Sequence, residues 1–255
     1  MKKRTCTLWL TGLVALSLVP SCADFGSSQL EADDPELLGL APEGDDGKAD
    51  SISSTSTYYR ARKDMRRCAY PACGGYFVKR VNQPTTRCVD GVYRNECYVS
   101  DILYSRLGLS DSALSAFADL VASGKAVVRG TYSVWYRDGR AFAKLGVTEG
   151  WRPATDRAPT GTFYRVRDNG VRCITFPCFS IHEAKLNSTI STNLSGVDLG
   201  SAGAPEDLTQ KGYDQIFGTT SGLVIAGVNR TVPRAGPAGD GRELVASQFY
   251  FKVVP

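Results

Sequence analysis

The alternation of apolar and polar side chains along the chain predicts a mainly β protein with some helix. Between residues 58 and 63, aromatic or small side chains alternate with arginine, which is typical of a strand half exposed to water. Further strands are predicted at residues 75–81, 96–104, 125–136 and 140–151. Asp138-Gly139, between the last two segments, is a strong hairpin-turn signal.

One segment has the period of a helix. Ser110 can cap its start and Gly124 can end it. Its apolar residues, on one helical face, are Leu114, Phe117, Leu120 and Val121. Three strands, a helix and two strands is the order of an OB-type barrel, and a curved sheet packed on one helix is the alternative.

The chain also repeats itself. Residues 59–82 align without a gap with residues 164–187, and seven of these 24 positions are identical: one Tyr, three Arg, two Cys and one Asn. A second anchor is Asp138-Gly139-Arg140 against Asp240-Gly241-Arg242. The repetition predicts a duplicated domain.

The predicted boundaries follow from this repetition. Repeat domain 1 covers residues 58–154, a linker covers 155–162, and repeat domain 2 covers 163–255. In the second copy Pro205 suits a helix start and Gly218 a helix end. Its last strand is expected to place one set of residues on a single face: Val245, Phe249, Phe251 and Val253.

The first residues predict export. A basic start is followed by an apolar stretch, residues 5–19, that is too short to span a bilayer. Leu18-Val19-Pro20-Ser21-Cys22 resembles a bacterial lipobox, so residues 1–21 are expected to be a signal peptide and Cys22 the lipidated first residue. Ala23 then resembles an outer-membrane sorting signal. Ordinary cleavage near Ala23, which would release a free secreted protein, is the alternative.

Residues 22–57 form the expected tether. From residue 23 onwards the segment has nine acids and one base, with many Ser, Gly and Pro. Such a composition buries too little apolar surface to offset chain entropy, so it predicts an acidic disordered linker.

Six cysteines remain after Cys6 and Cys22, and an even number in an exported protein indicates disulfides. A pair of cysteines five positions apart occurs in both copies, whereas a further pair of cysteines is found only in the first copy. The predicted bonds are Cys68–Cys73, Cys88–Cys97 and Cys173–Cys178. A zinc site built from the four cysteines of the first copy is the competing interpretation.

The first short loop also carries a resemblance. The motif Cys68-x4-Cys73-Gly74-Gly75-Tyr76-Phe77-Val78 is similar to an uncharacterised domain of bacterial secreted lipoproteins. The resemblance covers both repeats, and that family has no settled activity to carry over.

Residues for catalysis are few. His182 is the one histidine, which excludes a multi-histidine metal centre and leaves no obvious Ser-His or Cys-His pair. We expect no metal and no cofactor. Glu149, between Val147 and Trp151 on the expected inward face, is the candidate for a catalytic carboxylate. Its counterpart in the second copy is expected to be Phe251.

Positive charge is concentrated in the first copy. Residues 58–98 hold nine bases and three acids, a net charge of 9 − 3 = +6, with seven tyrosines and phenylalanines among them. The arginines that both copies keep, among them Arg60, are expected to be framework. The predicted binding residues are Lys79, Arg80, Arg87 and Arg94 with Tyr76 and Tyr93. The four bases among them are expected to lack basic matches where the two copies align.

These features leave three hypotheses. The first is a lipid-anchored cell-envelope protein that binds an anionic polymer, such as peptidoglycan, lipopolysaccharide or acidic polysaccharide, or an unknown protein partner. The second is a protease inhibitor that presents a disulfide-closed loop. The third is a carbohydrate-active hydrolase that uses Glu149. Nucleic acid is not expected, since an anchored envelope protein meets the other polymers first.

Overall fold

A computed structural model of the protein describes residues 50–51 and 56–255, which belong to one compact unit. The predicted signal peptide, Cys22 and nearly all of the acidic segment lie outside the described residues. None of the helices in the described part is long and apolar enough to cross a membrane.

Strands make up most of the regular structure. They are β1 (Asp50–Ser51), β2 (Thr57–Lys63), β3 (Tyr76–Arg80), β4 (Thr86–Arg87), β5 (Tyr93–Arg94), β6 (Cys97–Val99), β7 (Asp101–Leu103), β8 (Val127–Arg137), β9 (Arg140–Pro153), β10 (Thr162–Asp168), β11 (Ile181–Lys185), β12 (Ser191–Leu194), β13 (Gly196–Asp198), β14 (Leu223–Gly236) and β15 (Gly239–Lys252). The helices are α1 (Asp111–Ala122) and α2 (Glu206–Gly218), with short 3-10 turns η1 (Ser105–Leu107) and η2 (Gly200–Ala202).

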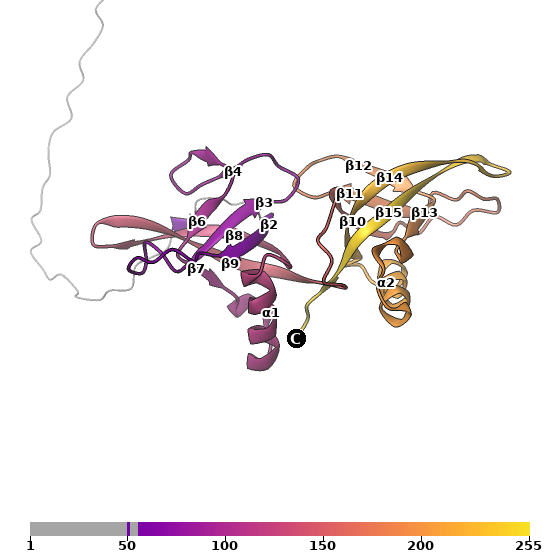
Figure 1. The fold of residues 1–255 in the computed structure, drawn as a ribbon. Helices are drawn as coiled ribbons and strands as arrows, with labels where there is room; N and C mark the ends of the chain where they lie inside the picture. The colour runs from indigo at the N-terminus through magenta and orange to yellow at the C-terminus, as the bar shows by residue number, and fades with distance from the viewer. Residues whose placement is uncertain (1–49, 52–55) are drawn as a thin grey trace, which may run out of the picture. The chain divides into compact units, whose positions relative to one another are not determined.

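Thirteen of these strands form one continuous sheet. Its main path is β12-β11-β10-β14-β15-β9-β8-β2-β3-β6, and β1, β13 and β7 pair beside it with β8, β15 and β9. Most pairs are antiparallel, and the sheet is not closed (Figure 1). The mainly β class is therefore confirmed, whereas two OB-type barrels are not. Each half has an open sheet with one helix, the arrangement named above as the alternative.

The two halves of the sheet follow the same plan. Tyr59 on β2 pairs with Arg80 on β3, and Tyr164 on β10 pairs with Lys185 on β11; 59 + 105 = 164 and 80 + 105 = 185. Each half then adds a parallel strand, a 3-10 turn, one α-helix and a long hairpin. Figure 1 shows the two hairpins reaching away from each other.

The halves meet where β9 pairs with β15, with Trp151 opposite Lys252. Residues of both halves form the buried cluster here: Tyr58, Val81, Val127, Trp151, Phe163, Leu186, Val224, Ala226 and Tyr250. Because this core belongs to neither half alone, the first half packs directly against the second.

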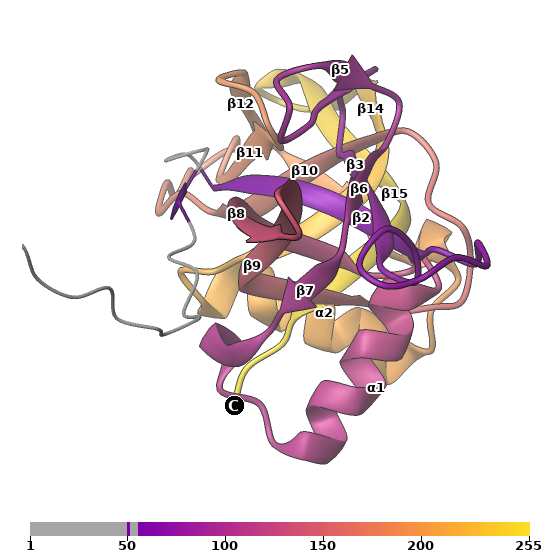
Figure 2. The same ribbon diagram turned by 90° about the vertical axis from the view of Figure 1, so that its left-hand side faces the viewer.

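Each half also has its own core beneath its helix. In α1, Phe117 and Val121 lie four residues apart and are both buried, as the helical spacing predicted. Burial of a side chain of this size stabilises the fold by about 1.5–3 kcal/mol. Figures 1 and 2 show that α1 and α2 lie on the same side of the sheet.

The three predicted disulfides are confirmed. Cys68–Cys73, Cys88–Cys97 and Cys173–Cys178 have Cα atoms 5.4, 5.3 and 5.5 Å apart, an ordinary separation. Since the four cysteines of the first half are joined in two disulfides, the zinc interpretation is wrong.

The segment at residues 155–162, predicted as a linker, is tied to the second half. The side chain of Gln248 is wholly buried and donates from Nε2 to the carbonyl oxygen of Thr155 at 2.8 Å. The Ser247 hydroxyl donates to the carbonyl of Thr160 at 2.7 Å and accepts from its N–H at 2.9 Å. These bonds make the segment part of the folded unit.

Local corrections concern strand boundaries and faces. The predicted strand at 96–104 is two strands, because β6 pairs with β3 while β7 turns to pair with β9. The second hairpin turns between Gly236 and Gly239, so Asp240-Gly241 is not its turn. A bulge beside Ser247 shifts the last strand by one residue; Leu244 and Ala246 then join Phe249 and Phe251 in the core.

Candidate functional site

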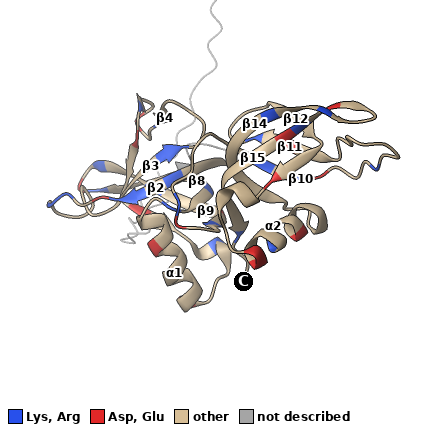
Figure 3. Ribbon diagram, turned by 45° about the vertical axis from the view of Figure 1, so that its right-hand side comes forward, with Lys and Arg blue, Asp and Glu red and all other residues tan. Residues whose placement is uncertain are grey.

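The candidate site is built on the face of β2 and β3 that points away from the first core. Strand alternation buries Ala61 and Val78 and turns their neighbours outward. Arg60 pairs in register with Lys79, and Arg62 with Phe77. Figure 3 shows Lys and Arg along these two strands.

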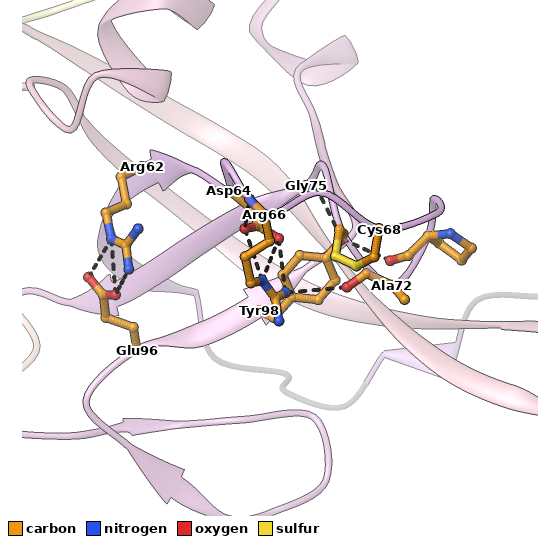
Figure 4. Close-up of polar contacts among 10 residues, drawn as sticks. Arg62, Asp64, Arg66, Cys68, Ala72, Gly75, Glu96 and Tyr98 are labelled. Carbon is orange, nitrogen blue, oxygen red and sulfur yellow. Dashed lines mark hydrogen bonds and ion pairs between the residues drawn. A yellow bond between two sulfur atoms is a disulfide. The ribbon is translucent and has the colours of Figure 1, made fainter.

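Two ion pairs order this face (Figure 4). Arg62 binds Glu96 at 2.6 Å, and Arg66 binds the fully buried carboxylate of Asp64 at 2.9 Å. The hydrogen bonds from Arg66 hold the pKa of the Asp64 carboxyl below its ordinary value. Both guanidinium groups also lie over the ring of Phe77, at 4.6 and 5.0 Å. Arg62 and Arg66 are therefore occupied by acids of the same chain.

The first disulfide loop is fastened to this face by Tyr98. The Tyr98 hydroxyl donates to the carbonyl of Pro71 at 2.8 Å and accepts from the N–H of Gly75 at 3.2 Å (Figure 4). Arg66 donates to the carbonyl of Ala72 at 3.3 Å. Burial raises the pKa of the Tyr98 hydroxyl. These three hydrogen bonds attach the short loop to the face of β2 and β3.

Two adjoining hollows open on this face. The first has a volume of about 540 Å³ and lies between the two halves; its lining residues are Arg60, Ala61, Arg62, Phe77, Lys79, Arg80, Val81, Asn82, Gln83, Pro84, Glu96, Gly124, Gly161 and Phe163. The second, of about 580 Å³, is lined by Phe77, Lys79, Arg94, Asn95 and Glu96. We call the two together the cationic cleft, and Lys79 lines both parts.

The cationic cleft gathers some of the predicted binding residues. Lys79 is exposed, and Arg80 lines the first hollow with a buried Nε that has no hydrogen-bond partner among the described residues. Arg94 lines the second hollow, but it is paired with Asp90 at 2.6 Å. The ion pair reduces what Arg94 can offer a ligand.

The other predicted binding residues lie elsewhere. Arg87 and Tyr93 pair with each other on the small β4–β5 ribbon, and both are exposed. Tyr76 is on the opposite face of β3, packed against the first core, with Lys63 over its ring at 4.5 Å. Tyr76 is three positions from Lys79, and an odd spacing in a strand separates two side chains.

The comparison of the halves corrects one argument about specificity. The β10–β11 register places Lys185 at the position of Arg80, so Arg80 does have a basic counterpart. Ala184 stands at the position of Lys79. Lys79 is therefore a cation that the first half alone has at its position, as is Lys63, whose counterpart is Asp168.

Arg60, which is expected to be a framework residue, binds the backbone of its own half. Its Nε donates to the carbonyl of Gly124 at 3.0 Å. In the second half Arg165 donates to the carbonyl of Ser221 at 2.8 Å. Each arginine thus binds the segment that follows the helix of its own half.

Glu149 is bound within the protein. Its carboxylate accepts a hydrogen bond from Arg129 at 2.9 Å, and its side chain is 16% exposed. A bulge beside Thr148 turns Trp151 into the junction core while Val147 stays in the first core. The two do not share an inward face, which corrects the sequence interpretation.

The register also replaces the expected counterpart of Glu149. Glu149 pairs with Arg129, and at the corresponding place Gln248 pairs with Ala226. The counterpart is therefore Gln248, which is buried, and the expectation of Phe251 is wrong. A gap-free alignment cannot follow hairpins of different length.

The sequence analysis did not predict the part of the cationic cleft that lies between the two halves. Asn82, Gln83 and Pro84 follow β3, whereas Gly161 and Phe163 come from the start of the second half. Only the matching position of one Asn in each copy of the repeat hinted at a shared role for Asn82.

The fold and this cleft define a disulfide-bonded, mainly antiparallel β protein whose two halves share one sheet. The family model described as a domain of unknown function (DUF6748) matches residues 57–255, and the chain belongs to this family. Searches of the curated proteins and of the solved structures found no match. This single match covers both predicted repeats.

Proposed function

We propose that this protein is a non-catalytic, exported binding protein of the cell envelope, and that its cationic cleft binds an anionic polymer. Exposed cations such as Lys79 attract phosphate or carboxylate groups along such a polymer. The three disulfides fit an exported or extracellular protein.

The observation that carries the proposal is the difference between paired and unpaired cations. Arg62, Arg66 and Arg94 are neutralised by acids of the same chain. Within residues 56–255, Lys79 and Arg87 form no ion pair and are exposed. Positive charge that the protein does not neutralise itself is what an anionic ligand would use.

The test is a co-sedimentation assay with insoluble peptidoglycan and with immobilised lipopolysaccharide or acidic polysaccharide, at low and physiological salt. Lys79→Glu should weaken retention on one polymer by about tenfold or more, equivalent to about 1.4 kcal/mol. The matched control is Arg106→Glu, at an exposed cation outside the cleft, with the same change in net charge.

Equal weakening by both variants would show that net charge alone causes retention and would overturn the proposal, as would unchanged retention by Lys79→Glu. Both variants should keep the melting temperature of the parent protein, because both side chains are exposed.

We also propose that Cys22 is acylated and anchors the protein at the outer membrane, as its lipobox-like context suggests. Metabolic labelling with a palmitate analogue should mark the parent protein and not Cys22→Ser. Labelling of neither would support release as a free secreted protein.

The repeated register further leads us to infer that the gene of an ancestral half was duplicated. Identical offsets of 105 residues for both members of the first strand pair support this. Loss of one cation, Lys79 against Ala184, would then mark where the halves diverged in function.

A protease inhibitor is the second candidate, favoured by the exposure of the Cys173–Cys178 loop. Ile174 is fully exposed at its tip and Phe176 is 52% exposed. A short closed loop loses little entropy on binding. If this candidate holds, Ile174→Asp should abolish inhibition of a susceptible protease while Ile190→Asp, at another exposed site, should not.

A further inference from the structure

A second cleft lies between the two helices, and it shares no lining residue with the cationic cleft. Its volume is about 660 Å³, within the range of small-molecule sites. The lining is mainly apolar and includes Ala113, Ala116 and Phe117 of α1 and Arg152, Lys211 and Phe251 of the opposite wall. Figures 1 and 3 show α1, α2 and the chain end that borders it. We call it the interhelical cleft.

The floor of the interhelical cleft is the junction of β9 and β15. The N–H of Val253 donates to the carbonyl of Gly150 at 2.9 Å, which extends this pairing beyond the strand. A Cβ on Gly150 would lie 2.5 Å from the ring of Phe117, so glycine is needed for the helix to approach. The floor is therefore fixed by backbone bonds and close packing.

The wall from α1 is apolar and open. Ala113 and Ala116 are exposed small residues one turn apart on this wall, and Phe117 is buried behind them. Small side chains leave the space that a larger residue would fill. An aliphatic chain in this space would contact alanine methyl groups and the edges of the core.

The opposite wall carries positive charge. Arg152 and Lys211 lie over the ring of Phe251, at 5.3 and 5.7 Å, and Lys252 follows Phe251 in the chain. In the described part of the chain none of these three cations forms an ion pair. Asp214 is the one acid of the lining, and it accepts a hydrogen bond from Gln210 at 2.9 Å.

We propose that the interhelical cleft binds a single amphiphilic anion, a long-chain molecule whose head group is a carboxylate or phosphate. The chain lies along the α1 wall, and the head group is neutralised by Arg152 and Lys211. Apolar lining alone would accept any amphiphile, and the excess of cations selects the anionic one. This site is separate from the cationic cleft, so neither proposal depends on the other.

The test is calorimetric titration of the purified protein, with its disulfides formed and without detergent. Three probes are used below their micelle concentrations: dodecanoate, dodecyl phosphate and dodecyltrimethylammonium. Saturable binding of either anion in a one-to-one complex is expected, with the cation at least about tenfold weaker. Absence of saturable binding by both anions, or equal affinity for the cation, would overturn the proposal.

Two pairs of variants locate the site. Ala116→Trp should fill the cleft and abolish binding, whereas Ser115→Trp, on an exposed position of α1 outside the lining, should not. Lys211→Glu should weaken anion binding about tenfold or more, while Lys185→Glu should leave it unchanged. Binding that survives Ala116→Trp, or that falls equally in a pair, would overturn the assignment.

Monomeric dodecanoate and anionic phospholipid vesicles distinguish a free fatty acid from a membrane lipid as the natural source. Vesicle binding that survives Ala116→Trp, without binding of the monomeric probes, would assign the effect to the protein surface and overturn the proposal.

Discussion

Asn82 holds the second half of the sheet from a turn in the first half. Its backbone has a φ of 59°, in the left-handed region that asparagine tolerates. Its side-chain Nδ2 donates to the carbonyls of Phe163 at 2.7 Å and Leu186 at 3.0 Å, and its Oδ1 accepts from the Phe163 N–H at 2.9 Å. Asn187, with a φ of 57°, makes a matching set of three bonds to the first half.

The perturbation is Asn82→Gly, which keeps the backbone conformation accessible and removes only the side chain. Each lost hydrogen bond is worth about 0.5–1.5 kcal/mol, so three bonds at a partly buried site predict a loss of about 2–4 kcal/mol in the free energy of unfolding. Asn82→Ala should cost about 1 kcal/mol more, because alanine resists the left-handed region. Asn187→Gly should behave like Asn82→Gly.

The assay is guanidinium unfolding followed by tryptophan fluorescence, since Trp151 lies in the shared core and Trp135 in the first hairpin. Asn95→Gly, at an exposed position without a side-chain hydrogen bond to the described residues, is the control. The parent protein should unfold in one transition. A loss below about 0.5 kcal/mol for Asn82→Gly, or two transitions in the parent protein, would refute a clamp between interdependent halves.

Three further predictions concern single residues of the sheet. Burial raises the pKa of Glu183, so the folded state keeps a proton that the unfolded state has lost, and stability should fall as pH rises from the ordinary carboxyl pKa through the raised value. The slope of this decline is at most about 1.4 kcal/mol per pH unit. Glu183→Gln, whose side-chain oxygen can still accept the hydrogen bond from Asn229, should remove the decline in melting curves measured across pH. Gly150→Ala should destabilise the protein by about 1–3 kcal/mol through its clash with Phe117, and an unchanged denaturation midpoint would show that the helix can retreat. Glu149→Gln should cost about 1 kcal/mol by removing a partly exposed ion pair and leave polymer retention unchanged; loss of a hydrolytic activity with stability intact would instead revive a catalytic role.

Local features of the fold could be read from the sequence because local physics determines them. The Ser110 and Gly124 signals bracket α1 closely, and Asp138-Gly139 is the observed turn of the first hairpin. The disulfides followed from comparing the copies, since Cys88 and Cys97 have no partners in the second. Each of these needs only neighbouring residues or the repeat itself.

What could not be read depends on distant pairing. No local pattern indicates that β9 joins β15, and this one pairing turns two expected domains into one sheet. The bulges beside Thr148 and Ser247 reverse the faces of the residues that follow, which is why Glu149 was assigned a false neighbour and counterpart. Charge counting also failed to separate Lys79 from Arg94, because a count of charges does not show that Asp90, four residues earlier, forms an ion pair with Arg94.

The difference between the halves gives a direct test of what makes a binding surface. Lys79 and Ala184 occupy corresponding positions, and Phe77 beside the first corresponds to His182 beside the second. If a single cation were sufficient, Ala184→Lys would restore polymer retention to a Lys79→Ala variant. We expect no restoration, because the second half lacks the Cys88–Cys97 excursion that carries the other exposed cations, and co-sedimentation of the double variant measures this. Recovery to the parental level would show that charge, and not the shape of the cationic cleft, governs binding.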